Sequence, residues 1–123
     1  MDGVGGEKNG ELGGSISGAR FEDTGCSYTM SLIQGKHKMA ILYCLMEYQP
    51  VRFNEMRRYL GGIADKTLSA NLKELERDGL ILRREYPQVP PRVEYSLTEL
   101  GTSLMEVLDG LCVWGTEHMP HRG

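Results

Sequence analysis

Basic and hydrogen-bonding side chains recur at helical spacing between residues 65 and 78 of this chain. Lysine can donate to the acceptor edge of guanine, and the amide of asparagine can form two hydrogen bonds with adenine. Small side chains between them would let a helix approach base edges closely. Lysine and arginine further along the helix are better suited to phosphates. The candidates for base contact are Lys66, Thr67, Ser69, Ala70 and Asn71, and those for phosphate contact are Lys73 and Arg77.

The alternative interpretation of this segment is an ordinary surface helix with a solvated polar face, which is the more frequent case for such a segment alone. Two flanking features favour contact with nucleic acid. A double-glycine turn, Gly61-Gly62, precedes the segment, and a predicted hairpin after it carries Arg83, Arg84 and Arg92 near its turn. Guanidinium groups on a stiff loop suit the DNA backbone or the minor groove. Basic residues also discourage pairing at a sheet edge, which is the competing explanation.

Thiol chemistry is a second possibility, because the chain has three widely spaced cysteines, Cys26, Cys44 and Cys112. An odd, scattered set favours a reducing compartment over a disulfide framework. Cys26 follows a glycine-rich segment and is expected to be exposed, and an exposed thiol near bases can be redox-active. An unreactive surface cysteine is equally compatible with the sequence. Cys44 is predicted to be a core residue, and Cys112 to be buried in the last helix or at a dimer contact.

Metal binding and catalysis have little support in the sequence. Cys112, His118 and His121 could form a metal site, but the two histidines flank a proline at the end of the chain. Histidines without a metal are the better interpretation, so we expect neither a metal nor a cofactor. Catalytic triads, nucleotide-binding loops, paired catalytic carboxylates and zinc ribbons are all missing from the sequence. We therefore expect a protein that is not an enzyme.

The net charge of −3 is distributed unevenly along the chain. Residues 1–25 carry five acids and two bases, residues 52–92 six acids and nine bases, and residues 93–123 five acids and one base. The central segment can therefore attract a polyanion although the whole chain is acidic. No apolar run approaches the ~20 residues of a membrane span, and no export signal is apparent. We expect a cytoplasmic protein that does not bind membranes.

The elements that must position these residues belong to one ordered domain, predicted over residues 26–119. Residues 1–25 contain eight glycines and are predicted to be a flexible tail that adds nothing to the core. Residues 120–123 are predicted to be a frayed C-terminus. A chain of this length can bury only a modest core.

Three helices are predicted in the first half of the ordered domain. The first is short and has Met30 and Ile33 on one face. The second covers residues 37–48, and because it is apolar on nearly every side it is predicted to lie at the centre of the core. The third begins near Phe53, with Asn54 as its N-terminal cap.

The basic segment is itself predicted to be a helix over about residues 65–78. Leu68, Leu72 and Leu75 recur at helical spacing and define its buried face, and Gly79 is expected to end it in a left-handed conformation. Residues 81–86 and 92–97 are predicted to pair as a hairpin, because apolar and polar residues alternate in the second run.

Thr98 is predicted to cap a final helix. Its inward stripe is expected to consist of Leu100, Leu104, Val107, Leu108 and Leu111, widened by Met105, Cys112 and Trp114. This stripe covers more of the helix than a small core requires, which predicts a dimer interface. The residues expected in that interface are Met30, Ile33, Leu104, Leu108, Leu111 and Cys112. Alternatively, the stripe only covers the hairpin and the central helix.

Helix, turn, helix and hairpin in this order predict a winged helix-turn-helix. The fold class is α+β and mostly helical, with dimerisation helices at the N- and C-terminal ends.

Three motifs, RFNEMRRYL, LSANLKELERDGLI and YPQVPPRVEYSLTELG, carry a family resemblance that extends from Cys26 to about Gly115. The chain resembles the HxlR family of bacterial and archaeal transcription regulators, which are relatives of the MarR-type winged helices. The third motif is close to diagnostic for this family. The resemblance implies a homodimer, joined through its first and last helices, that binds pseudo-palindromic operators as a repressor or an activator.

The same resemblance implies roles for individual parts of the chain. The helix at 65–78 would be the recognition helix, and the hairpin with Arg92 would be the wing. Cys26 matches a cysteine that senses oxidants or electrophiles in several members. The chain departs from the family pattern in having Ser27 instead of proline and His37 instead of tryptophan. Where the family often has a serine cap this chain has Ala64, so Asp65 is expected to take over as the cap of the recognition helix.

Two alternatives to a redox-responsive DNA-binding regulator remain open. One is a regulator whose effector is a small molecule bound between the wing domain and the dimer helices, which predicts an apolar cavity near Tyr43, Met46 and Trp114. The other is a winged helix used for contact with another protein.

Overall fold

The computed structural model describes residues 14–120, which fall into two compact units. The first unit ends at Ser31 and the second begins at Leu32. Residues 1–13 and 121–123, which include parts of the predicted tail and C-terminus, lie outside the described residues.

The first unit contains a short 3-10 turn, η1 (Phe21–Asp23), followed by α1 (Gly25–Ile33), whose last residues belong to the second unit. Thr24 sets the start of α1, because its Oγ1 accepts a hydrogen bond from the Ser27 N–H at 3.0 Å. Local structure therefore begins within the segment predicted to be a flexible tail. Residues 14–25 are nevertheless all exposed.

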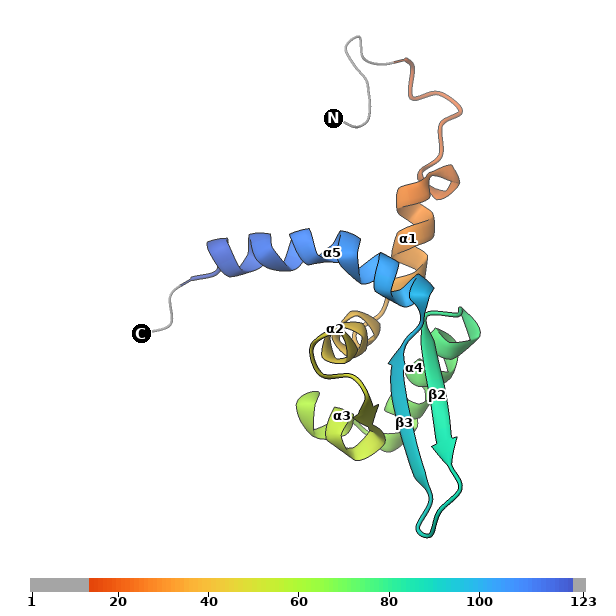
Figure 1. The fold of residues 1–123 in the computed structure, drawn as a ribbon. Helices are drawn as coiled ribbons and strands as arrows, with labels where there is room; N and C mark the ends of the chain where they lie inside the picture. Colours follow the sequence, from red (N-terminus) through yellow and green to blue (C-terminus); the bar gives the residue numbers. More distant parts are fainter. Residues whose placement is uncertain (1–13, 121–123) are drawn as a thin grey trace. The chain divides into compact units, whose positions relative to one another are not determined.

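The second unit contains the predicted winged helix-turn-helix, and the predicted α+β fold is confirmed (Figure 1). A small antiparallel sheet, in the order β1-β3-β2, lies beside the helices. The elements are α2 (Lys38–Tyr48), β1 (Val51–Arg52), α3 (Phe53–Tyr59), α4 (Asp65–Arg77), β2 (Ile81–Tyr86), β3 (Arg92–Leu97) and α5 (Glu99–His118).

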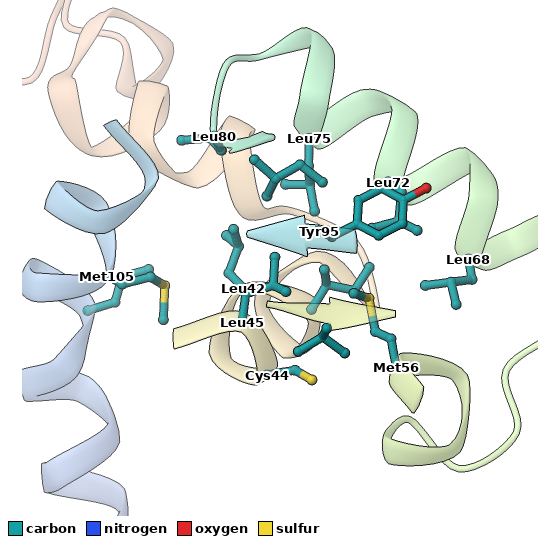
Figure 2. Close-up of a cluster of buried hydrophobic side chains, with 14 residues drawn as sticks. Leu42, Cys44, Leu45, Met56, Leu68, Leu72, Leu75, Leu80, Tyr95 and Met105 are labelled. Atoms are coloured by element: carbon teal, nitrogen blue, oxygen red, sulfur yellow. The ribbon is translucent and has the colours of Figure 1, made fainter. Parts of the chain in front are cut away.

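Helix α2 lies at the centre of the core, as its apolar sequence predicts. Ile41, Leu42, Cys44 and Leu45 are all at most 1% exposed. Figure 2 shows Leu42 and Leu45 between the leucines of α4 on one side and Met105 of α5 on the other. A helix that is apolar on several faces is stable only when neighbours cover each face, and here α3, α4, α5 and the sheet do so.

Strand β1 was not predicted, and it moves the start of α3. Val51 pairs with Tyr95 of β3, so Arg52 is extended and takes the capping position of the helix. The Glu55 carboxylate accepts the Arg52 N–H at 2.9 Å. The predicted cap at Asn54 is wrong, because Asn54 is already inside the first turn. A two-residue strand is too short to show an alternating pattern.

Helix α4 has the predicted buried leucines and the predicted end. Leu68, Leu72 and Leu75 are at most 2% exposed. Gly79 has φ +78°, and the N–H groups of Gly79 and Leu80 each donate at 3.0 Å to carbonyls of the last turn. This paired arrangement ends a helix without leaving its last carbonyls unsatisfied. The expected cap at Asp65 is wrong, because Ala64 takes the capping position without a side-chain bond and Asp65 is the first helical residue.

Helix α5 starts at the predicted cap, with the Thr98 Oγ1 accepting the Gly101 N–H at 3.0 Å. The predicted inward stripe is wrong in part: Leu100, Val107 and Leu111 are 52%, 74% and 64% exposed. The buried face is displaced by one residue and consists of Gly101, Met105 and Leu108. Gly101 makes this possible, because a Cβ there would lie 2.1 Å from the Leu80 carbonyl oxygen.

Candidate nucleic-acid interface

The face of α4 opposite its leucines presents an exposed basic stripe. Lys66, Ala70, Lys73 and Arg77 follow one another at intervals of four, three and four residues and are all exposed. This spacing places them on one side of an α-helix. Thr67 is exposed beside the stripe. The stripe has the composition that base and phosphate contacts require, with a small residue between two lysines.

Two of the predicted base-contacting residues lie at the margin of this stripe. Ser69 and Asn71 are half-buried. The Asn71 Nδ2 donates to the Thr67 carbonyl at 2.8 Å, one turn earlier in the same helix. Pairing of Asn71 with an adenine would therefore require this internal hydrogen bond to break.

An ion pair that was not predicted from the sequence joins α4 to the core helix. The Lys38 Nζ lies 2.6 Å from the Glu74 Oε1, and the Lys38 residue is only 7% exposed. The hydrogen bond and the charge of Lys38 lower the pKa of Glu74. Lys38 and Glu74 are far apart in the sequence, so only the fold could show that they meet. The pair joins the C-terminal half of α4 to the first residue of α2.

The wing, defined here as residues 81–97, carries its arginines on an aromatic support. Tyr86 pairs across the hairpin with Arg92, and the Arg92 guanidinium lies 4.3 Å from the centre of the Tyr86 ring. The Arg84 guanidinium lies 5.7 Å from the same ring. Tyr86 thus holds both predicted DNA-contacting arginines of the wing by cation–π contact. The sequence analysis did not assign this supporting role to Tyr86. The role could have been predicted, because the hairpin places this aromatic residue opposite Arg92 beside the turn.

Arg83 belongs to the opposite face of the hairpin from Arg84. It pairs in register with the buried Tyr95, and its Nη1 lies 3.3 Å from the Glu85 Oε1. A hydrogen bond with the Tyr95 side chain is the main cause that raises the pKa of Arg83. Arg83 is therefore bound within the wing, whereas Arg84 and Arg92 share the other face.

A family model matches nearly all of the second unit. The model, described as an HxlR-like helix-turn-helix, covers residues 32–122. This chain belongs to the HxlR-like helix-turn-helix family. An HTH-type transcriptional regulator of Halalkalibacterium halodurans is 57% identical over 98 residues, which are 80% of this chain and 87% of that protein. The HTH-type transcriptional regulator YdzF of Bacillus subtilis is 50% identical over 88 residues, or 72% of this chain and 81% of YdzF.

Solved structures of a redox regulator and of a transcriptional regulator are also similar to this HxlR-like chain. The redox regulator HypR in its oxidised form has a TM-score of 0.73 and 38% identity, covering 80% of this chain and all of HypR. The reduced form of the transcriptional regulator YodB from B. subtilis has a TM-score of 0.65 and 32% identity, covering 76% of this chain and 90% of YodB. The H. halodurans protein, YdzF and YodB all carry the name of transcriptional regulators.

The outer half of α5 presents the apolar stripe that was expected to face inward in this HxlR-like chain. Val107, Leu111 and Trp114 are separated by four and three residues and are 74%, 64% and 62% exposed. The Trp114 ring stacks on His118 at 4.2 Å, and the His118 Nδ1 lies 2.8 Å from the Trp114 carbonyl oxygen. The apolar stripe therefore reaches the last turn of the helix with an ordered aromatic pair.

The other predicted interface residues differ in how much surface they offer. Met30 is 51% exposed. Ile33 and Leu104 pack partly against the core, Cys112 is half-buried, and Leu108 is only 8% exposed. Leu108 is buried in the core of its own chain. Met30 and Leu111 therefore offer more apolar surface for contact with a second chain.

Cys26 and Cys44 lie where the sequence predicts them, but Cys112, which was predicted to be buried, is only half-buried. Cys26 is exposed in α1, Cys44 is buried in α2, and Cys112 is half-buried in α5. Burial raises the pKa of the Cys44 thiol, and the charge of Glu55 raises it further. Within residues 14–120 no three metal-ligating side chains come together, and His121 lies outside this range.

A groove between α2 and α5 occupies part of the region where an apolar cavity was expected. Its volume is about 350 Å³, and the residues that line it include Met46, Leu97 and Met105 together with Glu106 and Asp109. Of the three residues predicted to lie near the cavity, only Met46 lines this groove, and Tyr43 and Trp114 do not. Separately, none of the helices in the described part of the chain has the length and apolarity needed to cross a membrane.

Proposed function

We propose that this HxlR-like protein is a sequence-specific DNA-binding transcription regulator that acts in the cytoplasm as a homodimer on a pseudo-palindromic operator. The observation that carries the proposal is the exposed basic stripe of α4, on a helix whose other face is anchored in the core. A helix of this kind can enter the major groove. Base edges would be contacted by Lys66, Thr67, Ser69, Ala70 and Asn71, and phosphates by Lys73 and Arg77.

The wing supplies the second DNA contact in this proposal. Arg84 and Arg92 lie against Tyr86, which limits their motion before binding. Less conformational entropy is then lost when they meet a phosphate or the minor groove. Phosphate contacts fix the position of a protein on the duplex, and base contacts determine which sequence it recognises. The wing would therefore keep α4 in place along the DNA while α4 contacts the bases.

The homodimer is supported by the exposed apolar stripe of α5. An apolar surface of this kind is uncommon on a protein that stays monomeric. Two copies joined by a twofold axis would present two α4 helices to half-sites about 34 Å apart, which multiplies affinity and specificity. Met30, Ile33, Leu104, Leu108, Leu111 and Cys112 are the residues we place at or beside this contact.

We further propose that Cys26 makes the regulator responsive to thiol oxidants. Its side chain is exposed in the first turn of α1, and the similar proteins HypR and YodB include a named redox regulator and a structure treated with diamide. Diamide would join Cys26 to a second thiol: each thiol loses one hydrogen, a disulfide forms, and the diamide N=N bond takes up both hydrogens. A changed α1 would alter the spacing of the two α4 helices.

The deciding experiment is a mobility shift on the DNA upstream of the protein's own gene, with non-specific competitor, before and after diamide. A specific shift that diamide abolishes and reductant restores supports the full proposal. Cys26→Ser should bind DNA equally well and no longer respond to diamide. A diamide response that persists in Cys26→Ser would rule out Cys26 as the sensor. No shift at low or moderate salt would favour a winged helix that contacts protein instead.

A small-molecule effector is the second candidate, and the groove beside Met46 is the observation that favours it. It predicts a specific DNA shift that does not respond to diamide. A ligand in this groove would raise the melting temperature, because binding to the native state alone stabilises it. Thermal-shift screening of wild type against Met46→Trp, which would fill the groove, tests this candidate.

A further inference from the structure

A polar pocket lies between the start of α3 and the start of β3, outside the recognition helix. Its volume is about 500 Å³. Arg52 and Arg58 line it from the α3 side, and Arg92 from the wing. Phe53 and Pro91 add apolar walls. The start of α3 is thus a direct neighbour of the wing, as Figure 1 also shows.

The pocket has an excess of positive charge. Glu55 is the one acid in its lining, and the Glu55 carboxylate accepts the Arg52 backbone N–H at 2.9 Å. Among residues 14–120, no carboxylate oxygen lies within 4.0 Å of a side-chain nitrogen of Arg52 or Arg58. Two of the three guanidinium groups in the lining, those of Arg52 and Arg58, therefore have no ion-pair partner among the described residues, whereas Arg92 lies near Glu94.

Arg92 presents a guanidinium to the pocket in a fixed position. Its Nε is buried, and no atom of the described residues accepts a hydrogen bond from it. The nearest carboxylate oxygen, on Glu94, is 3.6 Å away, which is beyond hydrogen-bonding distance. A buried donor without an acceptor costs free energy. The stacking on Tyr86 holds this guanidinium in place, and 32% of the Arg92 side chain remains exposed to an anion.

We propose that Arg52, Arg58 and Arg92 form a phosphate clamp that holds the sugar-phosphate backbone of DNA between α3 and the wing. The clamp rests on the proposed DNA-binding function and extends it to α3, which has no place in the recognition surface described above. Guanidinium groups suit this occupant because their planar fork can donate two hydrogen bonds to one phosphate. The clamp shares Arg92 with the wing, so a backbone strand that reaches the wing is already at the pocket.

The test is Arg58→Gln in the full-length protein, with binding to operator and scrambled duplexes measured by fluorescence anisotropy over a series of salt concentrations. A phosphate contact carries no sequence information, so affinity should fall by a similar factor, roughly ten-fold, on both duplexes. The slope of log K against log salt should become shallower by about one. Arg52→Gln should behave alike, and Lys73→Ala serves as the reference for a phosphate contact on α4.

Lys36→Gln is the matched control, because it removes one exposed positive charge outside the clamp, the wing and α4. Its salt slope should stay within the error of wild type. Circular dichroism and melting temperature confirm that each variant is folded. Unchanged slopes in both folded arginine variants, with normal wild-type binding, would overturn the clamp alone. A loss confined to the operator would overturn it too, since it would mean base contact, and a wild type that binds neither duplex would overturn the DNA-binding function as well.

Discussion

Helices α4 and α5 follow the same rule on their buried sides and differ on their exposed sides. Each buries three residues at helical spacing against the core around α2: Leu68, Leu72 and Leu75 in α4, and Gly101, Met105 and Leu108 in α5. Outside, α4 has the basic stripe and α5 has the apolar stripe. The fold therefore gives two surfaces with different partners, because a charged stripe gains from a polyanion and an apolar stripe gains only from another protein surface.

The largest effect is expected in the shared core. Leu72→Ala should lower the free energy of unfolding by about 2–5 kcal/mol, because it leaves a cavity beneath α4. Leu111→Ala removes a side chain of the same size from the exposed stripe of α5. In dilute protein its effect should stay within about 0.5 kcal/mol. Urea unfolding at low and equal concentrations of both variants measures the difference, and equal effects would mean that Leu111 is also a core residue.

The next effect concerns the glycine that brings α5 close to the core. Gly101→Ala should cost about 1–3 kcal/mol of unfolding free energy, because the added Cβ would lie 2.1 Å from the Leu80 carbonyl oxygen. Gly110→Ala is the matched control, since a Cβ there meets no atom within 4 Å. It should be neutral or stabilise the helix by up to about 1 kcal/mol. Two variants of equal stability would show that α5 can shift to accommodate residue 101.

The third prediction separates assembly from DNA contact. Trp114→Ala should weaken dimerisation by roughly ten-fold or more, because large aromatic residues contribute most to such interfaces. Sedimentation velocity over a range of protein concentrations measures the dissociation constant. Lys73→Ala, which changes the basic stripe of α4, should leave that constant unchanged. If Lys73→Ala also produced monomers, the division of roles between the two helices would be wrong.

The smallest effect is a pH dependence carried by the pair that joins α4 to α2. Lys38 lowers the pKa of Glu74 in the folded state, so ionised Glu74 stabilises the fold at neutral pH. This contribution is lost as the pH falls below the ordinary glutamate pKa of about 4.3 and through the lower folded-state pKa of Glu74. Wild type should lose melting temperature more steeply than Glu74→Gln in this acidic range, by less than about 4 °C, since 46% of the Glu74 side chain is exposed to screening by solvent. Glu76→Gln, an exposed acid on the same helix, should follow wild type.

Local sequence signals predicted most of the elements that carry the candidate interface. The leucines of α4, the stop at Gly79 and the cap at Thr98 depend on neighbours within one or two turns, so they can be recognised without the fold. The hairpin was likewise predicted from alternation and its proline-rich turn. The basic stripe of α4 followed directly, because the buried leucines define the opposite face.

Features that depend on contacts distant in sequence were missed. The ion pair of Lys38 with Glu74 and the short strand β1 exist only because other elements are in place. The predicted orientation of α5 was wrong for a different reason. Its apolar residues form two stripes displaced by one position, and the buried one begins with Gly101, which has no side chain to indicate burial. Leu100 and Leu111 belong to the other stripe, which was therefore predicted to be the buried one although it is exposed.

The join between the end of α4 and the start of α5 has a mechanical consequence. The Thr98 Oγ1 donates to the Gly79 carbonyl at 2.6 Å, and the Thr98 N–H donates to the Leu80 carbonyl at 3.1 Å. With Gly101 packed on that same carbonyl, the joint has little room to flex. A 20-residue helix is about 30 Å long, so α5 acts as a lever arm with its fulcrum at Thr98. A displacement of its far end by a few ångströms corresponds to a rotation of a few degrees about Thr98, where these hydrogen bonds connect α5 to the end of α4.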